Sequence, residues 1–387
     1  MNRLPALRFA LCGMLALAIA IGVGRFAFTP ILPMMQKDYA VTLRLAGLLA
    51  SANYAGYFMG ALSAIWIRIS VATIVRVSLV SLALLTAAMA AIHEPLAWLL
   101  LRFLAGMISA WVFVFASAYS LQQLAKHGSA RFSGIVFGGV GLGIALTGSL
   151  CLLFLRWSWS ADRAWTTAGV LALLLTLACW SGYAGAGQAP ASASKAAVAP
   201  LRLGRHLVMI LCYAMLGFGY IIPGTFLPAM AKQVILDPAV FGWAWPIFGV
   251  AALVSTLIAG GLSAHVPNRL VWSMSHVVMA IGVAMPVVSP GMAGIVVAAL
   301  CVGSTFVVAT MAGMQEARVA APEHASQLMA TMTAAFGLGQ IIGPLLVSLV
   351  ANEHNGMNAL LIVVALLLLV SAFEIARGSP KQIAQKK

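Results

Sequence analysis

A diverged internal repeat is the feature that most constrains how this chain folds. The segment GVGRFAFTPILPMM at 22–35 returns 195 residues later as GFGYIIPGTFLPAM at 217–230. Two shorter echoes keep nearly the same interval: GALSA at 60–64 matches GGLSA at 260–264, and the Gly-Leu-Gly of 141–143 returns at 337–339. In a chain of 387 residues, these intervals indicate that the second half is a copy of the first.

Long apolar runs fill both halves. Hydrophobic residues make up 63% of the chain and charged residues 8%, whereas a soluble domain carries about 25% charged residues. We count twelve runs of roughly the 20 residues that cross a bilayer as a helix. They cover 9–34, 43–67, 71–92, 96–120, 132–155, 164–184, 206–231, 239–264, 270–289, 291–315, 326–350 and 357–376. The runs lack the alternation of a barrel strand, so the sequence predicts an all-α membrane protein with twelve transmembrane helices.

The positive charges are distributed unevenly about these runs. If the N-terminus is cytoplasmic, fifteen Lys and Arg residues fall on cytoplasmic segments and five on external ones. This asymmetry predicts a multi-pass protein of the bacterial cytoplasmic (inner) membrane, with both termini in the cytoplasm. The net charge of +14 is then a signal of topology in a lipid bilayer, and we expect no nucleic-acid partner.

One segment interrupts the pattern midway. Residues 185–205 are rich in Ala, Pro, Ser and Gly and lack apolar periodicity, as in a flexible linker. We therefore predict an N-terminal six-helix bundle at 1–184, a cytoplasmic linker at 185–205, and a C-terminal six-helix bundle with a short basic tail at 206–387. Because six crossings return the chain to the same side, the two copies are expected to be parallel repeats.

Two arginines lie inside the predicted spans. Arg25 and Arg102 are expected about 10–12 Å below the outer surface, at matching depth. All eight carboxylates are expected in loops or at helix ends, so none neutralises the pair. A charge at this depth costs roughly 2.5–3.5 kcal/mol unless it faces water or a partner, which suggests an anionic substrate. The alternative is that each arginine binds main-chain carbonyls or extends to the interface.

Other polar residues in the spans are candidates for lining a substrate cavity. Asn53 and Tyr57 share a helix face, Tyr220 is the repeat counterpart of Arg25, and Gln340 lies among glycines. The alternative for each is a hydrogen bond between helices, which is the more frequent role of such residues. His276 is interpreted as a buried core histidine, with a proton site as the alternative. Five tryptophans near the outer boundaries are predicted to be interfacial anchors. They are Trp98, Trp157, Trp159, Trp243 and Trp245.

Small residues and prolines within the spans predict close helix packing or gating. The candidates are Gly60, Gly141, Gly143, Gly337, Gly339, Pro33 and Pro228.

No pattern in the chain predicts catalysis. There is no HExxH, no phosphate-binding loop and no paired carboxylate within a span, and the five cysteines lack metal-ligand spacing. We therefore expect no enzyme activity, no cofactor and no metal site.

The architecture resembles the major facilitator superfamily over the whole chain. Gly60, Leu62 and Arg68 are similar to the family motif after the second helix, although Ala64 stands where its aspartate is expected. Arg102 and Gly106 resemble the motif of the fourth helix. The strings GVGRFAFTPILPMM, ANYAGYFMGAL and GFGYIIPGTFLP resemble the YbfB/YjiJ group.

Repeat and resemblance together predict a secondary active transporter that works by alternating access on a small solute, with an organic anion as the hypothesis. Proton or ion coupling and a monomer are expected. With no acid at depth, Glu316, His276 or the substrate itself would carry a proton. Two alternatives stay open: a passive facilitator or channel, and a transporter-like sensor that binds its ligand without moving it.

Overall fold

The computed structural model describes residues 4–129, 132–185, 203–234, 237, 242–262, 266–350, 353 and 355–377. Every regular element within these residues is helical, which confirms the predicted class. The first half contains α1 (Leu4–Leu17), η1 (Ala18–Val23), α2 (Phe28–Asp38), α3 (Leu43–Ser63), α4 (Val71–Ala91), α5 (Pro95–Lys126), α6 (Ser133–Arg156) and α7 (Ala161–Cys179). The second half contains α8 (Leu207–Val234), α10 (Ala244–Leu262), α11 (Asn268–Val288), α12 (Met292–Ala320), α13 (Ala325–Val350) and α14 (Gly356–Arg377).

Several helices begin at residues that cap them. Thr42, Ser70 and Ser160 precede α3, α4 and α7, and each hydroxyl accepts a hydrogen bond from a main-chain N–H three residues on. Pro95 starts α5, where its missing N–H costs nothing. These signals fix where each crossing starts after a short loop.

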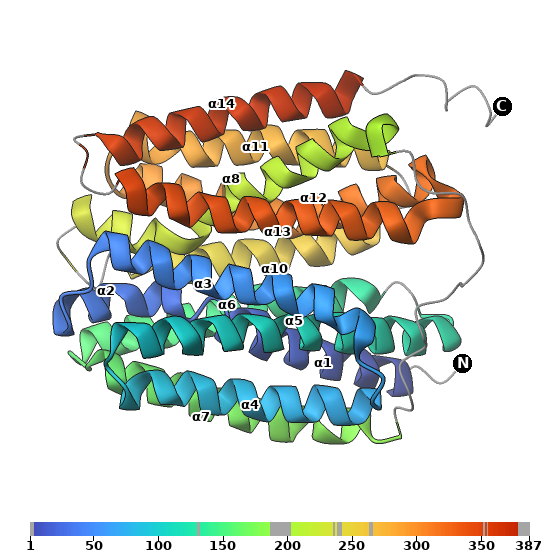
Figure 1. Ribbon diagram of the computed structural model, residues 1–387, viewed down its shortest axis with the longest axis horizontal. Helices are drawn as coiled ribbons and strands as arrows, with labels where there is room; N and C mark the ends of the chain where they lie inside the picture. Colours follow the sequence, from blue (N-terminus) through green and yellow to red (C-terminus); the bar gives the residue numbers. More distant parts are fainter. Residues whose placement is uncertain are drawn as a thin grey trace.

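The two halves lie side by side as two groups of helices (Figure 1). α3 packs against α13, α6 against α10, and α2 against α8, so these helices form the contact between the halves. α1 begins and α14 ends at the same end of the bundle (Figure 1). The linker predicted at 185–205 falls mostly on 186–202, outside the described residues.

Within the described residues, ten helical segments are long and apolar enough to cross a membrane, and the first of them, Leu4–Asp38, comprises α1, η1 and α2. α3 is not among them, since Arg44, Asn53 and two tyrosines lower its hydropathy, and α10 counts as a shorter apolar helix. The count of twelve crossings therefore stays a prediction. Large apolar side chains face outward, among them Leu174 at 58% exposure, as a lipid-facing surface requires.

Candidate functional site

The first crossing is broken where the sequence places Arg25. η1 is a π-helix, and the main-chain N–H groups of Gly24 and Phe26, just after it, each donate to a carbonyl five residues back, at 2.8 and 3.1 Å. Wide turns of this kind recur at functional sites. A β-carbon on Gly22 would lie 2.3 Å from the Gly143 Cα, so only glycine lets α6 approach this turn. The repeat counterpart, α8, runs through Tyr220 unbroken.

Arg102 holds this broken segment from α5. Its Nη1 donates to Gly24 O at 3.3 Å and its Nη2 to Arg25 O at 2.9 Å. Its Cζ lies 4.9 Å from the centre of the Phe28 ring. The two cations predicted at one depth are thus adjacent. Both terminal nitrogens of Arg102 already donate hydrogen bonds to main-chain carbonyls. Arg102 therefore holds the main chain at Arg25, which agrees with the alternative that this arginine binds main-chain carbonyls.

Arg25 is surrounded by aromatic rings. Its Cζ lies 3.9, 5.0 and 5.5 Å from the ring centres of Tyr57, Tyr54 and Phe26, and the residue is 4% exposed. Its Nε and Nη2 are buried without a hydrogen-bond partner. Among the described residues the only buried carboxylate is Glu316, and that group pairs with Arg269 at 2.7 Å. Arg25 is therefore a buried cation with no anion beside it.

Asn53, on α3, binds the main chain of Arg102. Its Nδ2 donates to Arg102 O at 2.8 Å, whereas its Oδ1 is buried without a partner. This bond between helices is the alternative that the sequence left open for Asn53.

The second half presents a stack of aromatic rings. Tyr220 lies between Phe306 and Phe336, with ring centres 5.1 and 5.7 Å away and planes within 15° of parallel. Gln340 Nε2 donates to the Tyr220 hydroxyl, and Gln340 Oε1 is buried without a partner. The Tyr220 hydroxyl is near enough to Arg25 to interact with it electrostatically. Tyr220 and Gln340, predicted separately, thus form one unit opposite the arginine.

Hydrogen bonds between the halves gather toward the end of the bundle where α2 ends and α3 begins. Each joins a residue of α2 or α3 to one of α8 or α13. They are Thr29 Oγ1 to Gly224 O at 3.2 Å, Tyr54 with Thr225 at 2.8 Å, Ser51 Oγ to Ile341 O at 3.2 Å, and Lys232 Nζ to Pro33 O at 3.0 Å. Pro33, a predicted gating residue, accepts one of them. The structure is closed at this end.

The predicted glycines lie at close helix approaches. A β-carbon would fall 2.2 Å from Met107 O at Gly60, 2.3 Å from Ala18 O at Gly143, and 2.3 Å from Ala214 O at Gly339, all within one half. Gly141 and Gly337 instead meet the other half, at 2.3 Å from Leu253 N and 3.0 Å from the Phe58 ring. Pro228 lies inside α8.

Three sequence-based expectations need correction. Trp98 and Trp245 are 2% and 0% exposed, so they are core residues and not interfacial anchors, whereas Trp157 and Trp243 are exposed. Glu316 was expected at a helix end, but α12 continues to Ala320 and buries it.

His276 is buried, as expected. Its Nδ1 lies 3.0 Å from Trp272 O and its Nε2 3.3 Å from Cys212 O.

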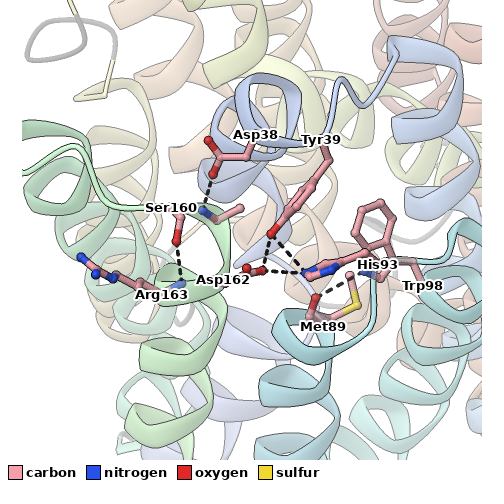
Figure 2. A network of polar contacts seen from close by, with 9 residues as sticks. Asp38, Tyr39, Met89, His93, Trp98, Ser160, Asp162 and Arg163 are labelled. Carbon is pink, nitrogen blue, oxygen red and sulfur yellow. Dashed lines mark hydrogen bonds and ion pairs between the residues drawn. The ribbon is translucent and has the colours of Figure 1, made fainter.

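Sequence reasoning missed a second polar cluster at the closed end of the bundle (Figure 2). The Tyr39 hydroxyl donates to Asp162 and lies 3.2 Å from His93 Nε2, while Asp38 accepts from the main-chain N–H of Ala161 at 2.7 Å. Partial burial, together with Asp162 and Asp38, raises the pKa of Tyr39 well above its ordinary value. The cluster ties the end of α2 to the start of α7.

The aromatic partners of Arg25 and Tyr220 were also missed. Tyr54 was within reach of sequence reasoning, because it follows Asn53 and shares a face with Tyr57. Phe306 and Phe336 carry no such signal, since a phenylalanine in an apolar run is equally compatible with facing lipid.

Comparison with known proteins bears on the family and the fold. A family model described as "Uncharacterised MFS-type transporter YbfB" matches residues 17–376. None of the curated proteins compared with the chain matches it. Among solved structures, the chain is similar to a crystal structure of a mutant of the nucleoside transporter NupG, with a TM-score of 0.73 and 15% identity over 99% of this chain and 100% of that one. A second NupG crystal structure gives a TM-score of 0.66 and 16% identity, with 97% and 98% covered. At these identities the likeness shows the fold alone.

Proposed function

Because the chain belongs to the family of MFS-type transporters that YbfB represents, we propose that it is a secondary active transporter that moves a small organic anion by alternating access. Family membership confirms the resemblance found in the sequence. It also makes the chain a multi-pass membrane protein and indicates a transporter, not an enzyme, acting on a small molecule. Direction, coupling and substrate go beyond that statement and form the proposal.

The two halves are the moving parts in this proposal. Residues 1–184 and 206–387 form two six-helix bundles of a twelve-helix protein, joined by a cytoplasmic linker at 185–205. They rock about a central site while both termini stay in the cytoplasm of the inner membrane. The hydrogen bonds between α2 or α3 and α8 or α13 support this arrangement, because they close one end and can be broken without unfolding either half. A monomer coupled to a proton or ion completes the proposal.

The environment of Arg25 is the main observation that supports an anionic substrate. A buried guanidinium is normally paired, because unpaired charge at depth is costly. Here Nε and Nη2 have no partner, Arg102 is engaged with main chain, and the buried carboxylate Glu316 is paired elsewhere. The rings that contact Arg25 belong to the first half, and two of them, Tyr54 and Phe26, contact Thr225 and Trp245 of the second half, so an anion bound there would lie close to both halves. Binding would thus be linked to the closing of the halves.

The test compares ligands and variants on purified protein. Thermal-shift measurements with carboxylates, sulfonates, neutral solutes and cations are expected to show stabilisation by anions alone. Arg25→Gln should abolish that stabilisation, and Arg163→Gln, which removes an exposed arginine, should retain it. An Arg25→Gln variant that is stabilised by the same anions to the same extent would contradict the proposal.

Flux measurements separate the alternatives. In reconstituted vesicles, an alternating-access carrier accelerates uptake of labelled anion when unlabelled anion is loaded inside. Flux without this exchange would indicate a passive facilitator or channel. Binding without any flux would indicate a ligand sensor.

A further inference from the structure

We propose that the substrate is an aromatic carboxylate that carries a hydroxyl group on its ring, away from the carboxylate. This inference rests on the proposed function and names the chemical class of its anion. Three features around the central site support it: the free edge of Arg25, the aromatic surfaces on both halves, and the unpaired amide oxygen of Gln340.

The free edge of Arg25 fits a carboxylate. Nε and Nη2 lie on the same edge of the planar guanidinium, and their N–H bonds point in parallel. This edge is the fork that binds the two oxygens of a carboxylate side by side. Both nitrogens of this fork are buried without a partner. A halide would use the fork less well, because it offers a single acceptor atom.

Aromatic rings surround the Arg25 guanidinium on the first half and form a series of contacts on the second half. On the first half, Tyr54, Tyr57 and Phe26 surround the guanidinium. On the second half, a series of ring contacts runs from Trp245 to Tyr213. Its members are Trp245, Phe248, Phe306, Tyr220, Phe336 and Tyr213, with ring centres 4.8 to 5.7 Å apart.

Phe26 and Trp245 join the two sets. Their ring centres are 5.9 Å apart, and theirs is the aromatic contact that the described residues make across the halves. When the halves separate, this contact opens and leaves ring surface on each side. A planar aromatic ligand replaces it with the stacked or tilted geometry that rings prefer, whereas a saturated ring of the same size does not.

Gln340 supplies the third feature. It is 0% exposed, its Nε2 is used on the Tyr220 hydroxyl, and its Oε1 has no partner. A buried acceptor left unpaired costs about 1–3 kcal/mol, so the site favours a ligand that pairs with it. A ligand hydroxyl suits this position, since it can pair with a primary amide in either of the amide's two orientations. Because the Gln340–Tyr220 unit lies on the half opposite Arg25, the hydroxyl belongs at the far end of the ligand from the carboxylate.

Four probes test the class on the purified full-length protein by calorimetry. 4-Hydroxybenzoate is expected to bind most tightly, benzoate about tenfold less tightly, and cyclohexanecarboxylate more weakly again, while the neutral 4-hydroxybenzyl alcohol does not bind. Gln340→Met, which keeps the side-chain volume, should reduce the affinity for 4-hydroxybenzoate about tenfold and leave that for benzoate unchanged. Arg25→Gln should abolish binding of both.

The outcomes distinguish the two proposals. Equal affinities for cyclohexanecarboxylate, benzoate and 4-hydroxybenzoate in the unmodified protein would overturn this inference and leave the Arg25 anion site standing. The same holds if Gln340→Met lowers the affinity for benzoate as much as that for 4-hydroxybenzoate. Tight binding of the neutral alcohol, with no carboxylate bound, would overturn the proposed function together with the inference.

Discussion

The hydrogen bond between Tyr54 and Thr225 allows the closed end of the bundle to be weakened by one defined interaction. The two hydroxyls lie 2.8 Å apart, each side chain is 1% exposed, and the residues belong to different halves. We consider Tyr54→Phe, Thr225→Val and the double variant. Phenylalanine keeps the ring beside Arg25, and valine keeps the shape of threonine, so the hydroxyls are the main change.

The expected magnitude follows from burial. Each single variant leaves one hydroxyl buried without a partner in the closed form, at a cost of about 1–3 kcal/mol. Since 1.4 kcal/mol is a factor of ten, the ratio of closed to open protein should fall by roughly 5- to 150-fold. The double variant leaves no orphaned hydroxyl. Its effect should be smaller than the sum of the two single effects by about 1 kcal/mol or more.

Pulsed electron paramagnetic resonance on spin labels reads this ratio directly. Labels at Arg44→Cys and Leu349→Cys, in a variant whose native cysteines are replaced, lie on α3 and α13 at the closed end. α3 and α13 meet there, since a β-carbon on Gly47 would fall 2.6 Å from Pro344 O. The single variants should add a population at longer distance. If the free-energy changes of the two single variants add up to that of the double variant, the reasoning is refuted, because additivity would mean that the two residues do not interact.

Three further predictions follow from other contacts. Gly141→Leu places a side chain where a β-carbon would already lie 2.3 Å from Leu253 N, so it should hold α6 and α10 apart and slow transport at least tenfold in vesicle flux. Circular dichroism of the full-length variant should show unchanged helix content. Glu316→Gln breaks a buried ion pair and should cost about 1–3 kcal/mol of stability, seen as a lower melting temperature than for Glu374→Gln, whose ion pair is exposed and 3.7 Å long. The Tyr39 hydroxyl, whose pKa is raised, should stabilise the protein fully at pH 7–9 and progressively less above a pH of about 10, whereas Tyr39→Phe should lack that alkaline loss in a melting series across pH.

Most of the predictions from the sequence came from the internal repeat and from the positions of the charged residues. Spacing alone placed Arg25 and Arg102 at one depth, because helical rise is constant, and the structure brings them together. The same reasoning missed the π-helix, since the glycines that permit it have counterparts in the unbroken α8. Local sequence does not determine such a break. Close packing does not distinguish the two helices either, because a β-carbon on Gly22 would lie 2.3 Å from Gly143 of α6 and one on its counterpart Gly217 would lie 2.3 Å from Phe336 of α13.

Side-chain direction was the other limit. Phe306 and Phe373 stand in equally apolar runs, yet one is buried in the aromatic stack and the other is 58% exposed. In a membrane protein both environments are apolar, so composition does not separate them. The same ambiguity explains why Trp98 and Trp245 were wrongly placed at the interface.

The uncompensated charge on Arg25 has an electrical consequence. With a monovalent anion bound, the Arg25 and Arg102 pair keeps one net positive charge within the membrane; when the site is empty, the pair holds two. When access changes from one side to the other, the fraction of the transmembrane voltage that acts on the buried charge changes too. Moving one charge across the whole field changes the free energy by about 2.3 kcal/mol per 100 mV. We therefore expect the return of the empty carrier to respond to voltage more strongly than the loaded step. Transient currents after a voltage jump should appear without substrate, shrink when anion saturates the site, and be smaller in Arg25→Gln, which retains only the charge of Arg102.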